Sequence, residues 1–403
     1  MKILLLNQTF YPDVMATGQY LSELASVLAK RGHAVTVITG RQAYDNRQVT
    51  FAPRENWGGV EIYRVYSTGY RKKTKWRRAM DFASFILSCC VRLASLPRHD
   101  VVVALTTPPL ISFIGAWRAT LWRSRFCYWV MDFNPDEAIA AGWLRADSAL
   151  ARILEQMSRF SLQKASSIIA LDRFMRDRIA AKEIAPEKIA VIPPWSHDDE
   201  VRFNSEGRNQ FRAAHGMEGK FVVMYSGNHS PVHPLDTLLA AAEQLKNHAE
   251  IMFCFVGGGS EFERVKQWVD QGKGHARYFP YQPLSELAAS LSAADAHVVV
   301  MGEAMLGLVH PCKIYNILAV GAPVIYIGPK SSHVTEVLDR LGDAYPSIRV
   351  SHGAADILAK QIQDLRQKMA THPRLSSPTA SADYSKEVML PKLVAVLEGL
   401  RDS

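Results

Sequence analysis

The stretch VMGEAMLGLVHPCKIYNILAVGAPVIYIG, residues 300–328, predicts a strand, a glycine-containing loop, a helix and a second strand. Residues 296–301 form the apolar, β-branched run that is typical of a buried parallel strand. Pro311 suits a first helical turn, because no backbone N–H is needed there, and Gly321 suits the helix end. Free N–H groups at a helix start, with Lys313 beside them, suit a phosphate group. The stretch therefore predicts a phosphate-binding helix start between two buried strands.

The chain alternates between strand and helix patterns in two blocks. The first block opens with a strand at residues 3–6, a loop that ends at Thr17 and Gly18, and an amphipathic helix from Gln19. A proline-containing polar stretch interrupts the pattern, and the alternation starts afresh at Phe221. Such alternation is typical of doubly wound α/β domains. We therefore expect an α/β protein with two Rossmann-like doubly wound domains that face each other across a cleft, residues 1–200 and residues 201–380.

Composition and charge restrict the possible functions. The chain has 403 residues, of which 48% are hydrophobic and 21% charged, as in a globular protein with a large core. Its net charge of +8 indicates anionic partners, whether nucleic acid, a membrane surface or phosphorylated substrates. The five cysteines show no zinc or disulfide spacing, which favours a reduced, cytosolic compartment. The apolar start at residues 2–6 is too short for a signal peptide, and no uncharged apolar run approaches the roughly 20 residues of a membrane-spanning helix.

A basic segment at residues 71–78 directly precedes an apolar helical pattern at residues 82–91. Basic and aromatic side chains joined to an apolar helix suit docking on an anionic membrane surface. A solvated loop before a core helix is the alternative. Nucleic-acid binding is a third use of such a segment, but no recognition helix, zinc site or RNA-binding platform supports it. The residues expected to dock on a membrane are Arg71, Lys72, Lys73, Lys75, Trp76, Arg77 and Arg78.

Carboxylates follow the strand predicted at residues 126–130. Asp132 comes first, and Asp136 and Glu137 follow four and five positions later. In a doubly wound sheet the carboxyl ends of the strands border the ligand crevice. Asp132 is therefore a candidate to orient an acceptor hydroxyl or to take its proton. Asp136 and Glu137 equally fit the N-cap and first turn of a helix.

Two further loops of the second half lie between a strand and a helix. Residues 226–234 can present backbone N–H groups and the imidazole of His233 to a phosphate, although a lone histidine in a loop is more often simply exposed. The glycines at residues 257–259 allow a nucleotide to approach the backbone. Neither loop has the spacing of a dinucleotide fingerprint, and a Walker lysine is absent. Hydride transfer and P-loop hydrolysis are therefore disfavoured.

These motifs together resemble those of the family-4 retaining glycosyltransferases, which have the GT-B fold. The resemblance covers almost the whole chain and is most specific at HPCKIY, residues 310–315, and LAVGAP, residues 318–323. The first of these is similar to the Pro-Ser-Lys-Leu-Tyr variant of bacterial enzymes that build O-antigen, capsule and exopolysaccharide repeats, close to the N-acetyl-L-fucosaminyltransferase type. Residues 107–109 and 132–137 resemble the acceptor-side loops of that branch.

The resemblance implies a nucleotide-diphosphate sugar in the second half, with the backbone at Thr17 and Gly18 closing over the sugar from the other domain. It also implies that the last helix, residues 381–403, packs back on the first domain. Transfer is expected to retain the anomeric configuration without metal or other cofactor, because the helix start and Lys313 stabilise the leaving diphosphate. The catalytic residues are expected to be Asp132 and Lys313. The nucleotide-sugar-binding residues are expected to be Thr17, Gly18, Gly227, Asn228, His233, Gly257, Gly258, Tyr281, Gln282, Glu303, His310, Cys312 and Asn316.

The sequence departs from the family pattern in the decisive stretch. Much of the family carries a Glu-x7-Glu pair here, whereas the corresponding positions hold Leu308 and Asn316. The Asn316 amide, which has both donors and an acceptor, is a candidate to bind a ribose hydroxyl. Glu303 is a candidate to replace the first acid by a shift of the loop. Arg and Lys are also common where this chain has Asn228 and His233, which leaves Lys313 as the main cation near the diphosphate.

Three functions fit these observations. The first is a retaining glycosyltransferase of the hexosyltransferase type, peripheral on the inner face of the cytoplasmic membrane. It is expected to move a sugar from a UDP-N-acetylhexosamine type of donor to a lipid-linked saccharide in bacterial surface polysaccharide biosynthesis. The second is a nucleotide-sugar 2-epimerase of the same fold, which needs acid and base carboxylates in the cleft. The third is a non-catalytic partner subunit, which the missing glutamates motivate.

Overall fold

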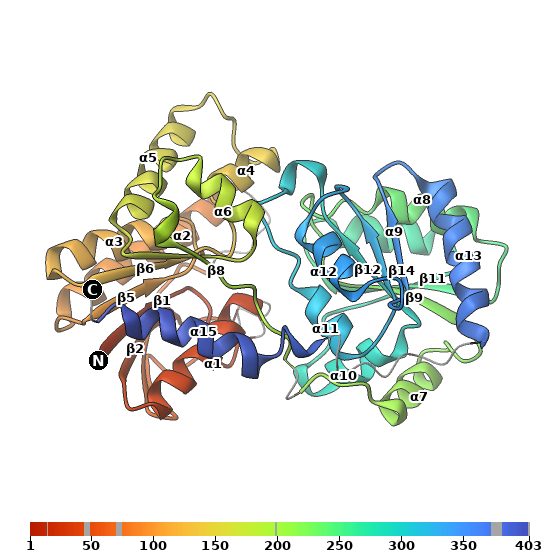
Figure 1. The fold of residues 1–403 in the computed structure, drawn as a ribbon, viewed down its shortest axis with the longest axis horizontal. Coiled ribbons are helices and arrows are strands. Elements are labelled where there is room, and N and C mark those ends of the chain that lie inside the picture. Colours follow the sequence, from red (N-terminus) through yellow and green to blue (C-terminus); the bar gives the residue numbers. More distant parts are fainter. Residues whose placement is uncertain (14, 44–48, 70–74, 198–199, 372–380, 402–403) are drawn as a thin grey trace. The chain divides into compact units, whose positions relative to one another are not determined.

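Two sheets, each covered by helices on both faces, organise the computed structural model (Figure 1). The structure describes residues 1–13, 15–43, 49–69, 75–197, 200–371 and 381–401. The first unit comprises Met1–Pro193, Gly307–His310 and Leu390–Ser403, and the second comprises Pro194–Leu306 and Pro311–Met389. The predicted α/β class with two Rossmann-like sheets is confirmed.

The first sheet has eight strands in the order β3-β4-β2-β1-β5-β6-β7-β8. Its strands are β1 (Lys2–Leu6), β2 (Ala34–Gly40), β3 (Arg54–Trp57), β4 (Val60–Val65), β5 (Val101–Ala104), β6 (Arg125–Trp129), β7 (Ser167–Ala170) and β8 (Ile189–Val191). Neighbouring strands are parallel, except that β3 and β4 form an antiparallel hairpin. That hairpin was not predicted, although Gly58 and Gly59, both at positive φ, are the residues that a two-residue hairpin turn requires.

Helices cover the first sheet on both faces, as right-handed crossovers require (Figure 1). The helices are α1 (Ala16–Lys30), α2 (Lys75–Ser95), α3 (Ile111–Trp122), α4 (Asp136–Ala140), α5 (Ala149–Lys164) and α6 (Arg173–Ala180). Most of the last helix, α15 (Lys386–Gly399), also belongs to this unit. Its Glu398 lies 2.8 Å from the Arg31 guanidinium and 2.9 Å from the His33 ring, both just beyond the end of α1.

The second sheet is wholly parallel, with the strand order β11-β10-β9-β12-β13-β14. Its strands are β9 (Phe221–Asn228), β10 (Ile251–Gly258), β11 (Ala276–Phe279), β12 (Ala296–Val300), β13 (Val324–Ile327) and β14 (Ser347–Val350). Its helices are α7 (Ser205–Ala214), α8 (Asp236–Gln244), α9 (Phe262–Asp270), α10 (Leu284–Ala293), α11 (Lys313–Ala319), α12 (His333–Leu341) and α13 (Ala355–Thr371). Both α12 and β14 were missed, although Ser332 and Thr335 form the capping box that starts α12.

Four predicted boundaries next to candidate site residues were wrong. Helix α1 begins at Ala16, so Thr17 and Gly18 lie in its first turn rather than in a loop. Strands β9 and β10 continue two residues beyond the ends that the sequence predicts, Ser226 and Val256, because Gly227 pairs with Gly257 and the next residues pair with each other. Helix α11 begins at Lys313, two residues after the predicted start.

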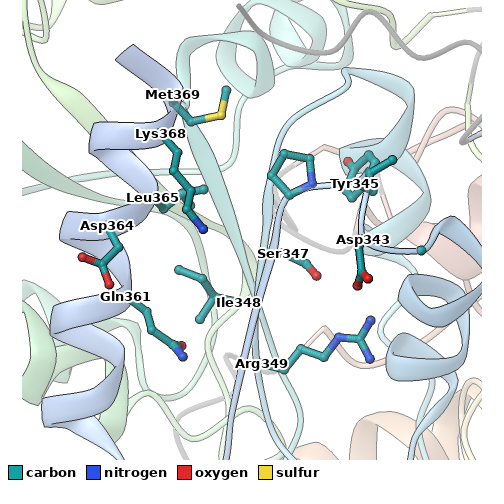
Figure 2. A pocket seen from close by; sticks show the side chains of 13 residues that line it. Asp343, Tyr345, Ser347, Ile348, Arg349, Gln361, Asp364, Leu365, Lys368 and Met369 are labelled. Carbon is teal, nitrogen blue, oxygen red and sulfur yellow. The ribbon is translucent and has the colours of Figure 1, made fainter. Parts of the chain in front are cut away.

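A groove of about 680 Å³ runs beside the edge strand β14 in the second unit (Figure 2). Gln361, Asp364 and Lys368 of α13 line one side, and Asp343 and Arg349 line the other. Its lining includes none of the predicted donor-site residues, so the groove does not coincide with the predicted site. Among the residues that the structure describes, every helix is too short or too polar to span a bilayer.

Candidate functional site

The carboxyl ends of β9 and β10 meet at glycines in the second unit. A Cβ on Gly257, whose φ is 136°, would lie 2.0 Å from the carbonyl oxygen of Gly227, so only glycine fits there. A Cβ on Gly227 would lie 2.8 Å from the Nζ of Lys313, and one on Gly258 would lie 3.1 Å from the ring of Tyr281. Gly257 therefore lets two backbones meet, whereas Gly227 and Gly258 keep space beside Lys313 and Tyr281.

Lys313 is the main charged group at these strand ends. Its Nζ lies 3.7 Å from the centre of the Tyr225 ring, whose hydroxyl donates to the carbonyl of Asn228 at 2.7 Å. The ammonium is buried and has no hydrogen-bond partner among the described residues. Burial lowers the pKa of Lys313 from 10.5 to about 7. A buried cation without a counter-charge is costly, so this position favours an anionic ligand.

A cavity of about 170 Å³ opens beside Lys313. It brings together the predicted catalytic Lys313 and four of the predicted nucleotide-sugar-binding residues, namely Gly227, Tyr281, Gln282 and Asn316. The rest of its lining is Ser226, Val256, Leu287, Leu291, His297, Val298 and Ile317. Among the described residues that line the cavity there is no carboxylate, and Lys313 is the one formally charged side chain.

Asn316 lines the cavity, but its side-chain oxygen already accepts a hydrogen bond. Its side-chain oxygen accepts a hydrogen bond from the backbone N–H of His197 at 3.1 Å. The structure therefore leaves the amide NH2, rather than both donors and acceptor, as the natural group to meet a ribose hydroxyl.

His233 is half-buried, and its ring already contacts the backbone. Its Nδ1 lies 2.8 Å from the carbonyl oxygen of Val300, which fixes this nitrogen as the protonated one. Burial, followed by the positive charge of Lys313, lowers the pKa of His233 to about 3. The predicted donation to a phosphate is therefore not favoured in this arrangement. His229, which was not among the predicted site residues, is buried. Its Nδ1 lies 3.0 Å from the Gly227 carbonyl oxygen, and burial lowers its pKa to about 4.

Nine of the thirteen predicted nucleotide-sugar-binding residues do not line this cavity, and Glu303, Cys312 and His310 are three of them. Glu303 is exposed on a short turn, Glu303–Met305, so the proposed shift into the place of the first acid is not seen. Cys312 is half-buried at the residue before α11. His310 belongs to the first unit, where its Nδ1 lies 2.7 Å from the carboxylate of Asp172. Asp172, which also caps α6 by accepting from the Met175 N–H at 2.8 Å, was not predicted.

The backbone at Asn228 pairs with Gly258, and its carbonyl oxygen accepts from Tyr225. Its side-chain oxygen would lie 2.4 Å from a Cβ on Gly259, which therefore must be glycine. Asn228 thus stabilises the strand ends, and its side chain is directed toward the glycine loop.

In the first unit, Asp132 follows β6 as predicted. Its backbone N–H donates to the Thr106 hydroxyl at 3.3 Å. Burial raises the pKa of the Asp132 carboxyl from 3.8 to about 6, which suits a general base near neutral pH. The Thr17 hydroxyl lies 3.1 Å from that of Thr9, and Gly18 packs so closely on Thr9 that a Cβ would lie 3.1 Å from its carbonyl carbon.

Part of the basic segment lies outside the described residues. Arg71, Lys72 and Lys73 fall in the range 70–74, which the structure does not describe. Lys75, Trp76, Arg77 and Arg78 begin α2, and of their side chains only that of Arg77 is described, as exposed.

Two family models match the chain. Residues 16–195 match a glycosyl transferase 4-like domain, and residues 207–342 match glycosyl transferases group 1. The chain is 24% identical to the "Putative colanic acid biosynthesis glycosyl transferase WcaI" of Escherichia coli (strain K12), over 99% of this chain and 100% of that protein. It is 25% identical to the "Probable glycosyltransferase WbjE" of Pseudomonas aeruginosa, over 81% of this chain and 80% of that protein.

Solved structures share the fold along the whole chain. Sucrose-phosphate synthase from Thermosynechococcus elongatus matches with a TM-score of 0.76 and 15% identity, over 99% of both chains. Anabaena Alr3699/HepE in complex with UDP-glucose matches with a TM-score of 0.73 and 14% identity, over 99% of this chain and 100% of that one. At such identities the likeness shows the fold alone, and it confirms the expected GT-B fold.

Proposed function

The chain belongs to the group 1 glycosyltransferases of the GT-B fold, and from this premise we propose that it transfers a sugar from a UDP-sugar to a lipid-linked saccharide. The predicted enzyme class, a glycosyltransferase, is confirmed by the family models that match its two halves. The pathway that we propose is the assembly of a bacterial surface polysaccharide, such as an O-antigen. The name of the Escherichia coli relative, which refers to colanic acid biosynthesis, supports this choice.

The observation that carries the proposal is the buried ammonium of Lys313, which has no hydrogen-bond partner in the described part of the chain. A donor diphosphate placed against its Nζ supplies the missing counter-charge and accepts charge-assisted hydrogen bonds. As the bond to the sugar breaks, negative charge grows on the leaving diphosphate. A fixed cation in a dry site stabilises that charge without reorganisation, so Lys313 acts on the leaving group. With no carboxylate in the cavity lining to hold a metal, we propose that the lysine does this without one.

Tyr281 and Gln282 are proposed to receive the base of the nucleotide. Both line the cavity that Lys313 borders, and Tyr281 is 46% exposed, which leaves its ring available for stacking. Gly227 is proposed to lie beside the diphosphate, because its lack of a side chain leaves room for the Lys313 ammonium directly against this backbone. The bound UDP-glucose of Anabaena HepE supports uridine as the base, and the resemblance described above supports a sugar of the N-acetylhexosamine type.

Asp132 is proposed to act on the acceptor. A carboxylate with a pKa of about 6 is mostly ionised at pH 7 and is basic enough to accept a hydrogen bond or proton from a sugar hydroxyl. We further propose that Thr17 and Gly18 close over the sugar, that transfer retains the anomeric configuration, and that the basic segment at residues 71–78 holds the enzyme at the cytoplasmic face of the membrane.

The alternatives gain less support. A 2-epimerase needs acid and base carboxylates around the sugar, and the cavity lining has none. A non-catalytic subunit is favoured by one specific observation, the replacement of both family glutamates. Leu308 is buried and its carbonyl accepts from the Phe133 N–H at 2.8 Å, and Asn316 takes the second position. Such a subunit would bind nucleotide but turn over only with a second protein present.

A panel of nucleotide sugars tests the proposal on the purified protein. We expect one UDP-N-acetylhexosamine to raise Tm and to be slowly hydrolysed, and we expect Lys313→Ala to lose both effects. Lys246→Ala, at an exposed lysine of the same unit, is the matched control and keeps both. If no sugar of the panel is hydrolysed or transferred, and Lys313→Ala binds nucleotide like the wild type, the proposal fails.

A further inference from the structure

Helix α2 has an apolar stripe on its solvent side. The stripe consists of Met80, Ala83, Leu87, Val91 and Ala94, all exposed. These positions recur every three or four residues and so share one helical face. Leu87 is 67% exposed and Val91 is 68% exposed. Large apolar side chains this exposed, in a continuous row, mark a surface that another apolar phase covers.

The stripe is separate from the face that holds α2 in the fold. Asp81, Phe85, Cys89 and Leu93 form the opposite row, and all four are buried. Asp81 is tied to the preceding loop, because its carboxylate accepts from the Gly69 N–H at 2.9 Å. The exposed row therefore contributes nothing to the core of the unit, and core packing does not account for its apolar character.

Helix α3 continues this surface. It contacts α2 on the same face of the first sheet (Figure 1). The guanidinium of Arg118 joins the two helices, because it donates to the carbonyl of Leu93 at 3.0 Å and lies 4.0 Å from the centre of the Trp122 ring. On its solvent side α3 exposes Trp117 at 48% and Leu121 at 56%.

Arginines surround the far end of both helices. A hollow of about 770 Å³ is lined by Arg98, which follows α2, by Arg123, which follows α3, by Arg125 and Arg401, and by one carboxylate, that of Asp100. Within the described part of the chain, none of these four forms an ion pair with a carboxylate. Residues 75–125 carry eight Lys or Arg side chains and only two Asp side chains. Asp81 is buried, and Asp100, which accepts from the Lys2 N–H at 2.7 Å, is outnumbered by the four arginines of the hollow.

We propose that the stripe of α2, with Trp117 and Leu121 of α3, inserts into the surface of an anionic lipid bilayer while the arginines at its end bind lipid headgroups. An apolar row, an interfacial Trp and a strongly basic border are the chemistry of a helix that lies in the plane of a membrane. The positive charge around the stripe favours an anionic bilayer over a second copy of the chain. A second copy would place its own positive charge against this one. This inference rests on the proposed function, because a lipid-linked acceptor resides in the bilayer.

Sedimentation with vesicles tests the proposal. The wild type is expected to bind vesicles that contain phosphatidylcholine and phosphatidylglycerol and to bind phosphatidylcholine vesicles weakly. Leu87→Asp combined with Val91→Asp is expected to lower vesicle binding by about tenfold or more. The variant loses the favourable free energy of transferring two apolar side chains from water into the bilayer. Ile357→Asp, at an isoleucine of α13 in the other unit that is 56% exposed, is the matched control and should bind like the wild type.

Two further measurements separate the outcomes. The UDP-induced rise in Tm should be the same in the double variant and the wild type, which shows that the variant is folded and that loss of docking is distinct from loss of the donor site. Arg98→Glu with Arg123→Glu should remove the preference for phosphatidylglycerol. Three results would each overturn the proposal. The Leu87/Val91 variant could bind vesicles as well as the wild type, or the wild type could fail to bind them. The wild type could also prove to be a dimer that the variant converts to a monomer.

Discussion

Replacement of Lys313 by methionine should have opposite effects on the ligand-free and the UDP-bound protein. The ammonium is buried without a hydrogen-bond partner, and burial lowers its pKa from 10.5 to about 7. One pKa unit corresponds to about 1.4 kcal/mol, so the charged lysine costs the folded protein on the order of 4 kcal/mol at acidic pH. Methionine fills nearly the same volume without the charge. Lys313→Met should therefore raise the free energy of unfolding of the ligand-free protein by about 1–3 kcal/mol at pH 6.

The sign of this effect changes with pH in a defined way. Because the pKa of Lys313 is lowered in the folded state, the unfolded chain holds one more proton between about pH 7 and 10.5. The stability of the wild type should therefore rise with pH through this window, and the advantage of Lys313→Met should shrink.

Addition of UDP should reverse the order of stability. The diphosphate forms charge-assisted hydrogen bonds with the ammonium, worth about 1.5–3 kcal/mol, and removes the cost of the unpaired charge. Urea unfolding at several UDP concentrations measures both effects on the same protein. If Lys313→Met is less stable than the wild type without UDP, and UDP stabilises both proteins equally, the assignment of Lys313 to the diphosphate is refuted.

Three other predictions follow from the same groups. UDP affinity should be highest at and below about pH 7 and fall at higher pH, because binding requires the protonated Lys313. Calorimetry in buffers of different ionisation enthalpy should show that UDP binding takes up a proton above that pH. Asp132→Asn should lower kcat by about 100-fold or more without weakening UDP, measured by steady-state kinetics and titration, and an equal loss of UDP affinity would contradict a role on the acceptor. Gly257→Ala should destabilise the protein by about 3 kcal/mol or more, because its Cβ would meet the Gly227 carbonyl at 2.0 Å, and an unchanged urea midpoint would contradict the close packing of β9 and β10.

The sequence was sufficient to predict the fold and the central cation. Apolar β-branched runs placed most strands, since such runs are buried on both faces of a parallel sheet. Lys313 was predicted because its motif is local, with the proline, the lysine and the helical face all within a few residues. Local signals for the β3–β4 hairpin, at Gly58 and Gly59, and for α12, at Ser332 and Thr335, were also present and were overlooked.

The rest of the site depends on contacts between residues far apart in the chain. The oxygen of Asn316 is engaged by the backbone of His197, and His310 is engaged by Asp172, and no local pattern reports either pairing. The lowered pKa of His233 arises from desolvation and from the charge of Lys313, whereas its sequence neighbours indicate only a loop. Exposure on α2 is likewise invisible to periodicity, because both of its faces carry apolar residues.

The central claim is that the donor diphosphate binds at Lys313. The most direct measurement is a calorimetric titration of UDP and of uridine into the wild type and Lys313→Met at pH 7. The account predicts that the wild type prefers UDP to uridine by about 100-fold, since one charge-assisted contact is worth roughly 1.5–3 kcal/mol, and that the variant loses most of this preference while uridine binds both proteins alike. A variant that keeps the full preference for UDP would contradict the account.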